Sequence, residues 1–267
     1  MEDKKPLLLI SNDDGYQAKG LRVLVEAVRH LGDVLVCAPE GGRSGMACAF
    51  SATKPLTLTP QKTDLGAFPA GNGKVEVWSC NGTPVDCVKM ALAELCPRRP
   101  DIIIGGINHG DNASVNVHYS GTMGVVLEGC MKYIPSVAYS LCNHEPDADF
   151  SPLVPYIKDF TARVLQQGLP LGVCLNVNFP DLPAFQGVRL CRMAHGTWGN
   201  EVVKCRHPRN YDYWWMVGSY TNDEPEADDT DNWALRHGYV AITPTRIDVT
   251  AYEAMDTVRE LLLSPLS

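Results

Sequence analysis

Short apolar runs alternate with amphipathic segments along the first two thirds of the chain. Residues 7–10 are apolar at every position, which is typical of a parallel strand that is covered on both faces. Residues 21–29 carry apolar side chains at helical spacing, and residues 34–38 form a second apolar run that Pro39 ends. This strand–helix–strand opening predicts a right-handed crossover and therefore a parallel sheet.

The alternation continues toward the C-terminus and predicts further elements of both kinds. Strands are expected at residues 75–78, 101–104, 135–140, 173–178 and 238–244, and helices at residues 84–95, 122–130, 156–167 and 253–262. The fold class that follows is α/β, with a Rossmann-like, doubly wound and mostly parallel sheet. The length of 267 residues is compatible with one large domain.

The composition changes after residue 195. Residues 196–232 are rich in Trp, Tyr, Gly and Asp and poor in aliphatic side chains. Within them, residues 224–231 are acidic and are predicted to form a solvated loop. We therefore divide the single domain, residues 1–267, into an α/β core at 1–195 and an irregular, β-rich C-terminal extension at 196–267.

The charge and the cysteines limit the partners and the compartment. A formal net charge of −8 disfavours binding to a nucleic-acid polymer or to an acidic membrane. No apolar stretch reaches the roughly 20 residues of a membrane-spanning helix, and the N-terminus lacks the apolar region of a signal peptide. The ten cysteines are scattered without a CxxC pair, which favours reduced thiols in a cytoplasmic protein.

Two adjacent carboxylates, Asp13 and Asp14, follow the first predicted strand. Like charges so close repel each other unless a proton or a cation separates them. Hard oxygen ligands favour one divalent cation, Mg²⁺ or Mn²⁺, and Gly15 permits the bend that lets both side chains converge. Capping of the following helix or a simple turn is the alternative interpretation, because Asp is common in both.

Two further polar loops are expected at the same edge of the sheet, since ligands bind outside the carboxyl ends of parallel strands. Residues 41–45 contain Arg43 and Ser44 between glycines, and they form either a phosphate-binding nest or a flexible turn. Residues 105–112 contain His109, which is a general acid, a metal ligand or simply hydrated. The absence of a GxxxxGKS/T loop, and of GxGxxG after the first strand, argues against P-loop NTPases and dinucleotide oxidoreductases.

Several separated motifs, in the same order, resemble the SurE family, the survival-protein-E 5′/3′-nucleotidases. They lie at residues 10–15, 38–39, 43–45, 81–87, 106–112, 119–122, 128–129, 230–231 and 238–244. The resemblance implies a phosphomonoesterase that acts on nucleoside 5′- and 3′-monophosphates with a divalent cation, and on polyphosphate in some members. It also implies a homodimer or homotetramer, in which residues 211–215 join subunits and a C-terminal strand and helix could exchange between them.

The family pattern places the metal ligands at Asp13, Asp14, Ser44 and Asn108. A water activated by the cation would attack the phosphate, with Asp13 and Asp14 as the catalytic pair, one of which could also accept a proton. N–H and hydroxyl groups would contact the phosphate, and the residues expected to supply them are Gly45, Asn112, Ser120, Gly121 and Thr122.

Two rival functions stay open from the sequence. A haloacid-dehalogenase-type phosphatase would form an aspartyl-phosphate, but that class needs Asp-x-Asp spacing, whereas Asp13 and Asp14 are contiguous. The other rival is a regulator that binds a nucleotide or a metal without turnover. The aromatic residues 211–215 could likewise pack on the protein's own core instead of joining subunits.

Overall fold

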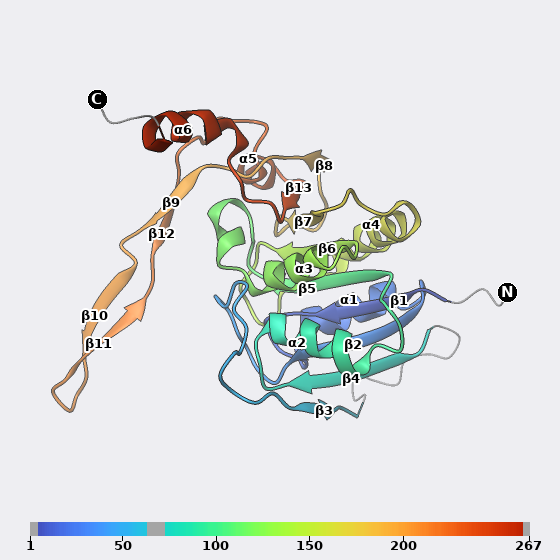
Figure 1. The fold of residues 1–267 in the computed structure, drawn as a ribbon. Helices are drawn as coiled ribbons and strands as arrows, with labels where there is room; N and C mark the ends of the chain where they lie inside the picture. The colour runs from blue at the N-terminus through green and yellow to red at the C-terminus, as the bar shows by residue number, and fades with distance from the viewer. Residues whose placement is uncertain (1–4, 63–72, 264–267) are drawn as a thin grey trace.

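A nine-stranded sheet runs through the computed structural model, which describes residues 5–62 and 73–263 (Figure 1). In spatial order its strands are β3 (Leu58–Pro60), β4 (Val75–Cys80), β2 (Asp33–Pro39), β1 (Leu7–Ser11), β5 (Ile102–His109), β6 (Ser136–Leu141), β7 (Val173–Phe179), β13 (Tyr239–Arg246) and β8 (Gly187–Leu190). The six strands from β4 to β7 in this order are parallel to one another. From β1 the chain winds first toward β4 and then, beginning at β5, in the opposite direction, which confirms the doubly wound α/β class.

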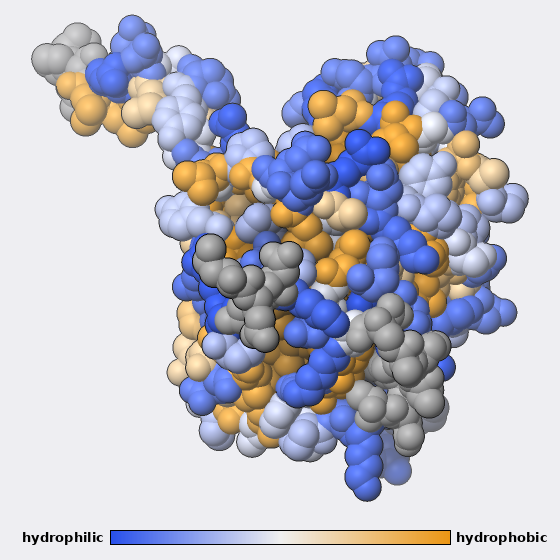
Figure 2. All heavy atoms as spheres, turned by 90° about the vertical axis from the view of Figure 1, so that its right-hand side faces the viewer, coloured by the Kyte–Doolittle hydropathy of each residue, from blue (hydrophilic) through white to orange (hydrophobic). Residues whose placement is uncertain are grey.

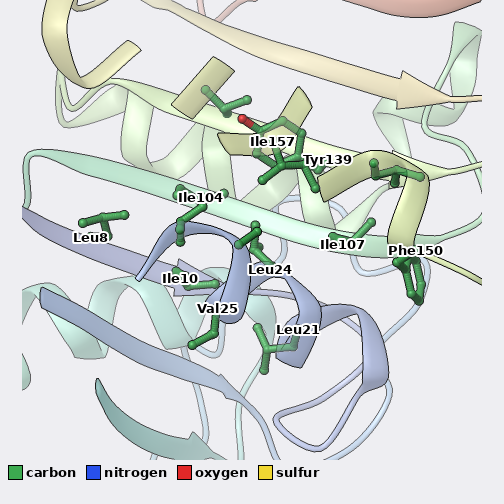
Figure 3. Packing of buried hydrophobic residues seen from close by; sticks show 14 of the residues in the cluster. Leu8, Ile10, Leu21, Leu24, Val25, Ile104, Ile107, Tyr139, Phe150 and Ile157 are labelled. Carbon is green, nitrogen blue, oxygen red and sulfur yellow. The ribbon is translucent and has the colours of Figure 1, made fainter. Parts of the chain in front are cut away.

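Two pairs of helices cover the two faces of this sheet. Helices α1 (Lys19–Val28) and α4 (Val154–Gln167) pack together on one face, and α2 (Pro84–Met90) and α3 (Gly121–Met131) pack together on the other. Because successive side chains of a strand point to opposite faces, β1 serves both layers. Leu8 and Ile10 pack in one hydrophobic cluster with residues of α1 (Figure 3). Leu7 and Leu9 pack in a second cluster with residues of α2 and α3, on the opposite face.

Local sequence signals account for the helix that begins at Pro84. Thr83 caps it, since its side chain accepts a hydrogen bond from the Asp86 N–H while the Asp86 carboxylate accepts one from the Thr83 N–H. Pro84 occupies the first turn, where a missing N–H costs nothing. The predicted helix at residues 84–95 is confirmed, although its last turn, Ala91–Leu95, is of the π type.

β5 is longer than the sequence pattern indicates. Gly105 and Gly106 were expected to end the strand and to leave Asn108 in a loop. Instead the strand continues to His109 across a shift in its register with β6 between Gly105 and Asn108. Such an irregularity admits glycine inside a strand, which explains why the glycines do not end it.

The last third of the chain contains more regular structure than predicted. Two antiparallel ladders, β9 (Gly196–Gly199) with β12 (Ser219–Asn222) and β10 (Val202–Arg206) with β11 (Asp212–Met216), form an arm, residues 196–222, that projects from the body (Figure 1). β13 then returns to the central sheet, antiparallel to β7. Because β13 belongs to the central sheet, the predicted boundary between residues 195 and 196 does not separate the sheet from the C-terminal extension.

The acidic segment at residues 224–231 is not a solvated loop as a whole. The Glu224 carboxylate accepts two hydrogen bonds from the Arg192 guanidinium, at 2.6 and 2.8 Å. Asp231 begins α5 (Asp231–Arg236) and is buried. Its carboxylate accepts hydrogen bonds from the Ser114 and Ala194 N–H groups, which satisfy it away from solvent. Arg192 and these N–H groups lie far away in sequence, so the segment alone could not reveal them.

The remaining short elements are three 3₁₀ turns, namely η2 (Ser114–His118), η3 (Ser151–Leu153) and η4 (Tyr252–Ala254), and the last described helix, α6 (Met255–Leu263). All ten cysteines are free thiols, as predicted. In the part of the chain that the structure describes, every helix is too short or too polar to cross a membrane.

Candidate metal and phosphate site

The two predicted carboxylates lie at the switch point of the sheet. β1 and β5 are neighbours, and the chain leaves their carboxyl ends in opposite directions. Asn12 shapes the turn after β1, because its side chain accepts a hydrogen bond from the Gly15 N–H and donates one to the Gly15 carbonyl. Gly15 has a φ of +103°, which a residue with a side chain rarely adopts.

Asp13 is almost completely buried, with 4% of its surface exposed. The Thr122 hydroxyl donates a short hydrogen bond to one of its carboxylate oxygens. Burial raises the pKa of Asp13 to about 6, and the neighbouring charge of Asp14 adds to the increase. A positive charge close to Asp13 would therefore stabilise the ionised form of its carboxylate.

Asp14 supplies the observation that best tests whether a cation fits. Its Oδ2 atom is buried and has no hydrogen-bond partner among the described residues. Burial raises the pKa of Asp14 as well, although a hydrogen bond from the His109 backbone N–H counteracts the increase. Since buried polar atoms are normally satisfied, an orphaned carboxylate oxygen beside a second carboxylate fits a metal ligand.

Ser44 and Asn108 come from the two neighbouring strand ends. The Arg43 N–H donates to the Asp13 carbonyl at 2.6 Å, which fastens the loop that carries Ser44 beside the acidic pair. Asn108 donates its side-chain N–H to the Gly110 carbonyl at 2.8 Å, so its Oδ1 is the atom available as a ligand. Two carboxylates, a hydroxyl and an amide oxygen make an all-oxygen set that suits Mg²⁺ or Mn²⁺.

No cluster of three or more His, Cys, Asp or Glu side chains that could hold a metal occurs among residues 5–62 and 73–263. A site built from only two carboxylates, Asp13 and Asp14, thus depends on neutral ligands. Ser44 and Asn108 are the side chains predicted for this role.

The N-terminus of α3 faces the same acidic pair. A β-carbon placed on Gly121 would lie 2.7 Å from the Asp13 Cβ and 3.0 Å from its Oδ2. Ser120 caps the helix by accepting a hydrogen bond from the Met123 N–H at 2.9 Å. The first N–H groups of an 11-residue helix attract anions, and the Gly121 N–H already donates to the Asp13 carboxylate. Thr122 follows where a phosphate would be favoured, while a phosphate contact of Gly121 stays a prediction.

Gly45 lies on the loop opposite α3. Its φ is +75°, and two residues later the Ala47 N–H donates to the Tyr119 carbonyl at 3.1 Å. This bond and the close approach of Gly124 to Ala47 hold the loop against the start of the helix. The predicted phosphate contacts at Gly45, Ser120, Gly121 and Thr122 therefore belong to segments that meet here.

Asn112 is directed toward the sheet instead. Its side-chain N–H donates to the Ser140 hydroxyl at 2.7 Å, and its backbone N–H donates to Asn178 Oδ1 at 2.8 Å. Asn176 completes this buried network by donating to the Asn112 carbonyl. The network ties the segment after β5 to β6 and β7, while a phosphate contact of Asn112 stays a prediction. Sequence reasoning missed Asn176 and Asn178, whose signal was two amides in an otherwise apolar strand.

His109 enters the site through its backbone more than its imidazole. The ring packs edge-on against Phe150, with 5.0 Å between centroids, and burial lowers its pKa. Its Nδ1 has no hydrogen-bond partner in the described part of the chain. The backbone N–H is the group that interacts with Asp14.

Comparison with known proteins agrees with this architecture. The family model described as survival protein SurE matches residues 8–200. The 5′-nucleotidase SurE of Phocaeicola vulgatus is 54% identical over 97% of this chain and 98% of its own length, and that of Bacteroides thetaiotaomicron is 52% identical over 96% of each. The crystal structure of the SurE protein from Aquifex aeolicus has a TM-score of 0.78 and 32% identity, covering 96% of this chain and 99% of that one. The chain therefore belongs to the SurE family.

Proposed function

We propose that this chain is a divalent-metal-dependent phosphomonoesterase that hydrolyses nucleoside 5′-monophosphates, and also 3′-monophosphates, with polyphosphate as a secondary substrate. The observation that carries the proposal is the Asp13–Asp14 pair beside the N-terminus of α3, in which Asp13 is buried and the Asp14 Oδ2 atom is buried without a hydrogen-bond partner among the described residues. Membership of the SurE family, with relatives named 5′-nucleotidase at 54% and 52% identity, supports the substrate class.

One set of residues would bind the cation, and another would bind the phosphate. Asp13, Asp14, Ser44 and Asn108 would bind one Mg²⁺ or Mn²⁺. When bound, the cation polarises the phosphoryl group and acidifies a water molecule. The Thr122 hydroxyl orients the Asp13 carboxylate, and N–H groups at the start of α3 stabilise the negative charge of the phosphoryl oxygens.

The reaction itself is a hydrolysis. The oxygen of a water molecule bonds to phosphorus while the ester bond between phosphorus and the nucleoside oxygen breaks. The proton that the water gives up is passed on to the leaving oxygen, so the products are the nucleoside, as an alcohol, and inorganic phosphate. Of the two carboxylates Asp14 is the less buried, so we assign to it the acceptance of the proton that the water loses. This role falls to its other oxygen, because Oδ2 is the atom offered to the cation. Asp13 already accepts a hydrogen bond from Thr122 and is the more deeply buried.

The direct test measures phosphate release from adenosine 5′- and 3′-monophosphate and from polyphosphate, with and without Mn²⁺ or Mg²⁺. Asp13→Asn should lower kcat/KM by roughly 10²–10³-fold, the scale on which lost electrostatic stabilisation of a transition state is felt. Asp159→Asn is the matched control, because Asp159 is exposed on α4 and pairs with Arg163. Its activity should equal that of the wild type.

Three outcomes separate the proposal from its rivals. Near-wild-type activity of Asp13→Asn would refute the metal assignment. A trapped phospho-aspartate would favour the dehalogenase-type mechanism. Binding of metal or nucleotide without any phosphate release would identify a regulator.

We also propose a cytoplasmic homodimer or homotetramer, assembled through the arm and α6. Ten free thiols support the compartment.

Trp214 and Trp215 on the arm are 58% and 62% exposed, so they do not pack on this chain's own core. Leu261, Leu262 and Leu263 of α6 are more than two thirds exposed, and Figure 2 shows hydrophobic side chains on the projecting end that carries this helix. Exposed apolar surface of this kind is typical of subunit contacts.

A further inference from the structure

A cavity of about 390 Å³ lies between the segment that follows β5 and the base of the arm. Its volume falls within the roughly 300–1,000 Å³ of small-molecule sites. The hydrolytic mechanism makes no use of it. The residues of its wall that matter here are Asp111, Trp198, Tyr220, Asn222 and Arg236.

Chain continuity places this cavity next to the phosphate site. The segment at residues 109–120 begins beside Asn108 and ends at the cap of α3, so both of its ends belong to that site, while its middle lines the cavity. Asp111 follows Asn108 by three residues, which limits their Cα separation to about 11 Å. A group esterified to a phosphate at α3 could therefore reach the cavity.

The aromatic wall is held rigidly. Trp198 donates its indole N–H to the Asn116 side chain at 2.9 Å, and 37% of its surface remains exposed. The Tyr220 ring lies 6.0 Å away at 59°, and its hydroxyl is bonded to Ser114 and Asn232. A fixed indole with an accessible surface is suited to stacking against a flat heterocycle.

The polar groups of the cavity suit an uncharged ligand that can both donate and accept hydrogen bonds. Asp111 accepts at Oδ1 from the Asn116 amide, so Oδ2 is its second acceptor. Asn222 accepts at Oδ1 from the Glu224 N–H, so Nδ2 is the donor that it can offer. Arg236 in the wall pairs with Glu226, so its charge does not offset that of Asp111, and the Asp111 carboxylate disfavours a second phosphate here.

We propose that this cavity binds the nucleoside part of the substrate, with the base stacked on Trp198. The proposal rests on the nucleotidase function proposed above and adds the determinant of its substrate preference. Stacking uses the π-face that every base has, so several bases should be accepted. The preference is then for a nucleotide over a phosphomonoester that lacks a base.

The test compares adenosine 5′-monophosphate with ribose 5-phosphate, which has the same reacting phosphate and no base. Trp198→Ala should raise KM for adenosine 5′-monophosphate about tenfold with little change in kcat, and should leave ribose 5-phosphate within about twofold. Trp198→Phe keeps a ring but loses the bond to Asn116, and it should recover most of the affinity. Tyr133→Ala, which removes an exposed ring at the amino end of β6, is the control.

Several results would overturn the proposal. They are an equal loss on both substrates, an unchanged KM for adenosine 5′-monophosphate, or Trp198→Phe behaving like Trp198→Ala. Calorimetric binding of adenosine, which needs no turnover, separates this inference from the catalytic one. Adenosine that binds the wild type but not Trp198→Ala would support the cavity even if phosphate release failed, and equal binding to both would refute it.

Discussion

Gly121 shows how tightly the acidic pair is enclosed by its surroundings. It occupies the first position of α3, where alanine would normally favour the helix. The side chain of Asp13, however, fills the space that a β-carbon would need. The identity of this residue is therefore set by the site and not by the helix.

We expect Gly121→Ala to lower kcat/KM for adenosine 5′-monophosphate at least about tenfold, because the added methyl group must displace the Asp13 carboxylate by a fraction of an ångström. Gly199→Ala is the matched control, since nothing lies within 4 Å of the point that its β-carbon would occupy. Steady-state kinetics of both variants, with circular dichroism to verify folding, make the measurement. Full activity of Gly121→Ala would contradict the enclosure of Asp13.

The segment that joins the arm to the sheet is held by an ionic clamp. Arg192 pairs with Glu224 through two hydrogen bonds and with Asp229 at 2.8 Å, and the Glu224 carboxylate also accepts from the His195 N–H. These hydrogen bonds lower the pKa of Glu224 from 4.5 to about 2. The clamp fixes the base of the arm, on which Trp198 stands.

The clamp gives stability a defined pH dependence. Because the pKa of Glu224 is lower in the folded than in the unfolded protein, its contribution is complete above about pH 4.5 and is lost as the pH falls toward 2. Glu224→Gln should therefore unfold at a lower temperature than the wild type at neutral pH, and this difference should shrink in acid. Glu226→Gln, whose carboxylate is 88% exposed, should show little change at any pH. A constant difference across the pH range would exclude the clamp.

The arm leaves the molecule with apolar surface that nothing in the described chain covers. Trp214, Trp215 and Met216 lie on β11, whose one partner among the described strands is β10. A two-stranded ribbon is marginally stable by itself in water. Contact with a second copy would both cover these side chains and stabilise the ribbon.

We expect the wild type to be a dimer or tetramer by size-exclusion chromatography with light scattering. The double variant Trp214→Ser/Trp215→Ser should shift toward smaller species because it loses the buried apolar area of the contact. Leu171→Ser, at an exposed position outside the arm and α6, should leave the mass unchanged. A monomeric wild type, or a double variant of unchanged mass, would refute assembly through the arm.

The sequence predictions were accurate for elements specified by neighbouring residues and inaccurate for elements that depend on contacts between distant segments. Strand β1 is buried at every position and β2 at every position after Asp33, and a local capping box begins the helix at Pro84, so these elements could be predicted from the sequence. The ladders of the arm are short and largely exposed, and the sequence alternation there is too weak to reveal them. The predicted β5 was too short because its glycines suggested an end where the structure has a register shift.

Periodicity and turn chemistry act over a few residues, so the chain's own pattern was enough to specify the α/β class, the order of the main elements and the acidic pair on which the metal proposal rests. The folded molecule was needed to show that Thr122 bonds Asp13 across 109 residues and that Asp231 is buried against Ser114 across 117. Only the folded molecule also shows that β13 pairs with β7 in the central sheet and that a cavity lies beside Trp198. These features depend on contacts between distant segments, which exist only once the sheet has brought its strand ends together.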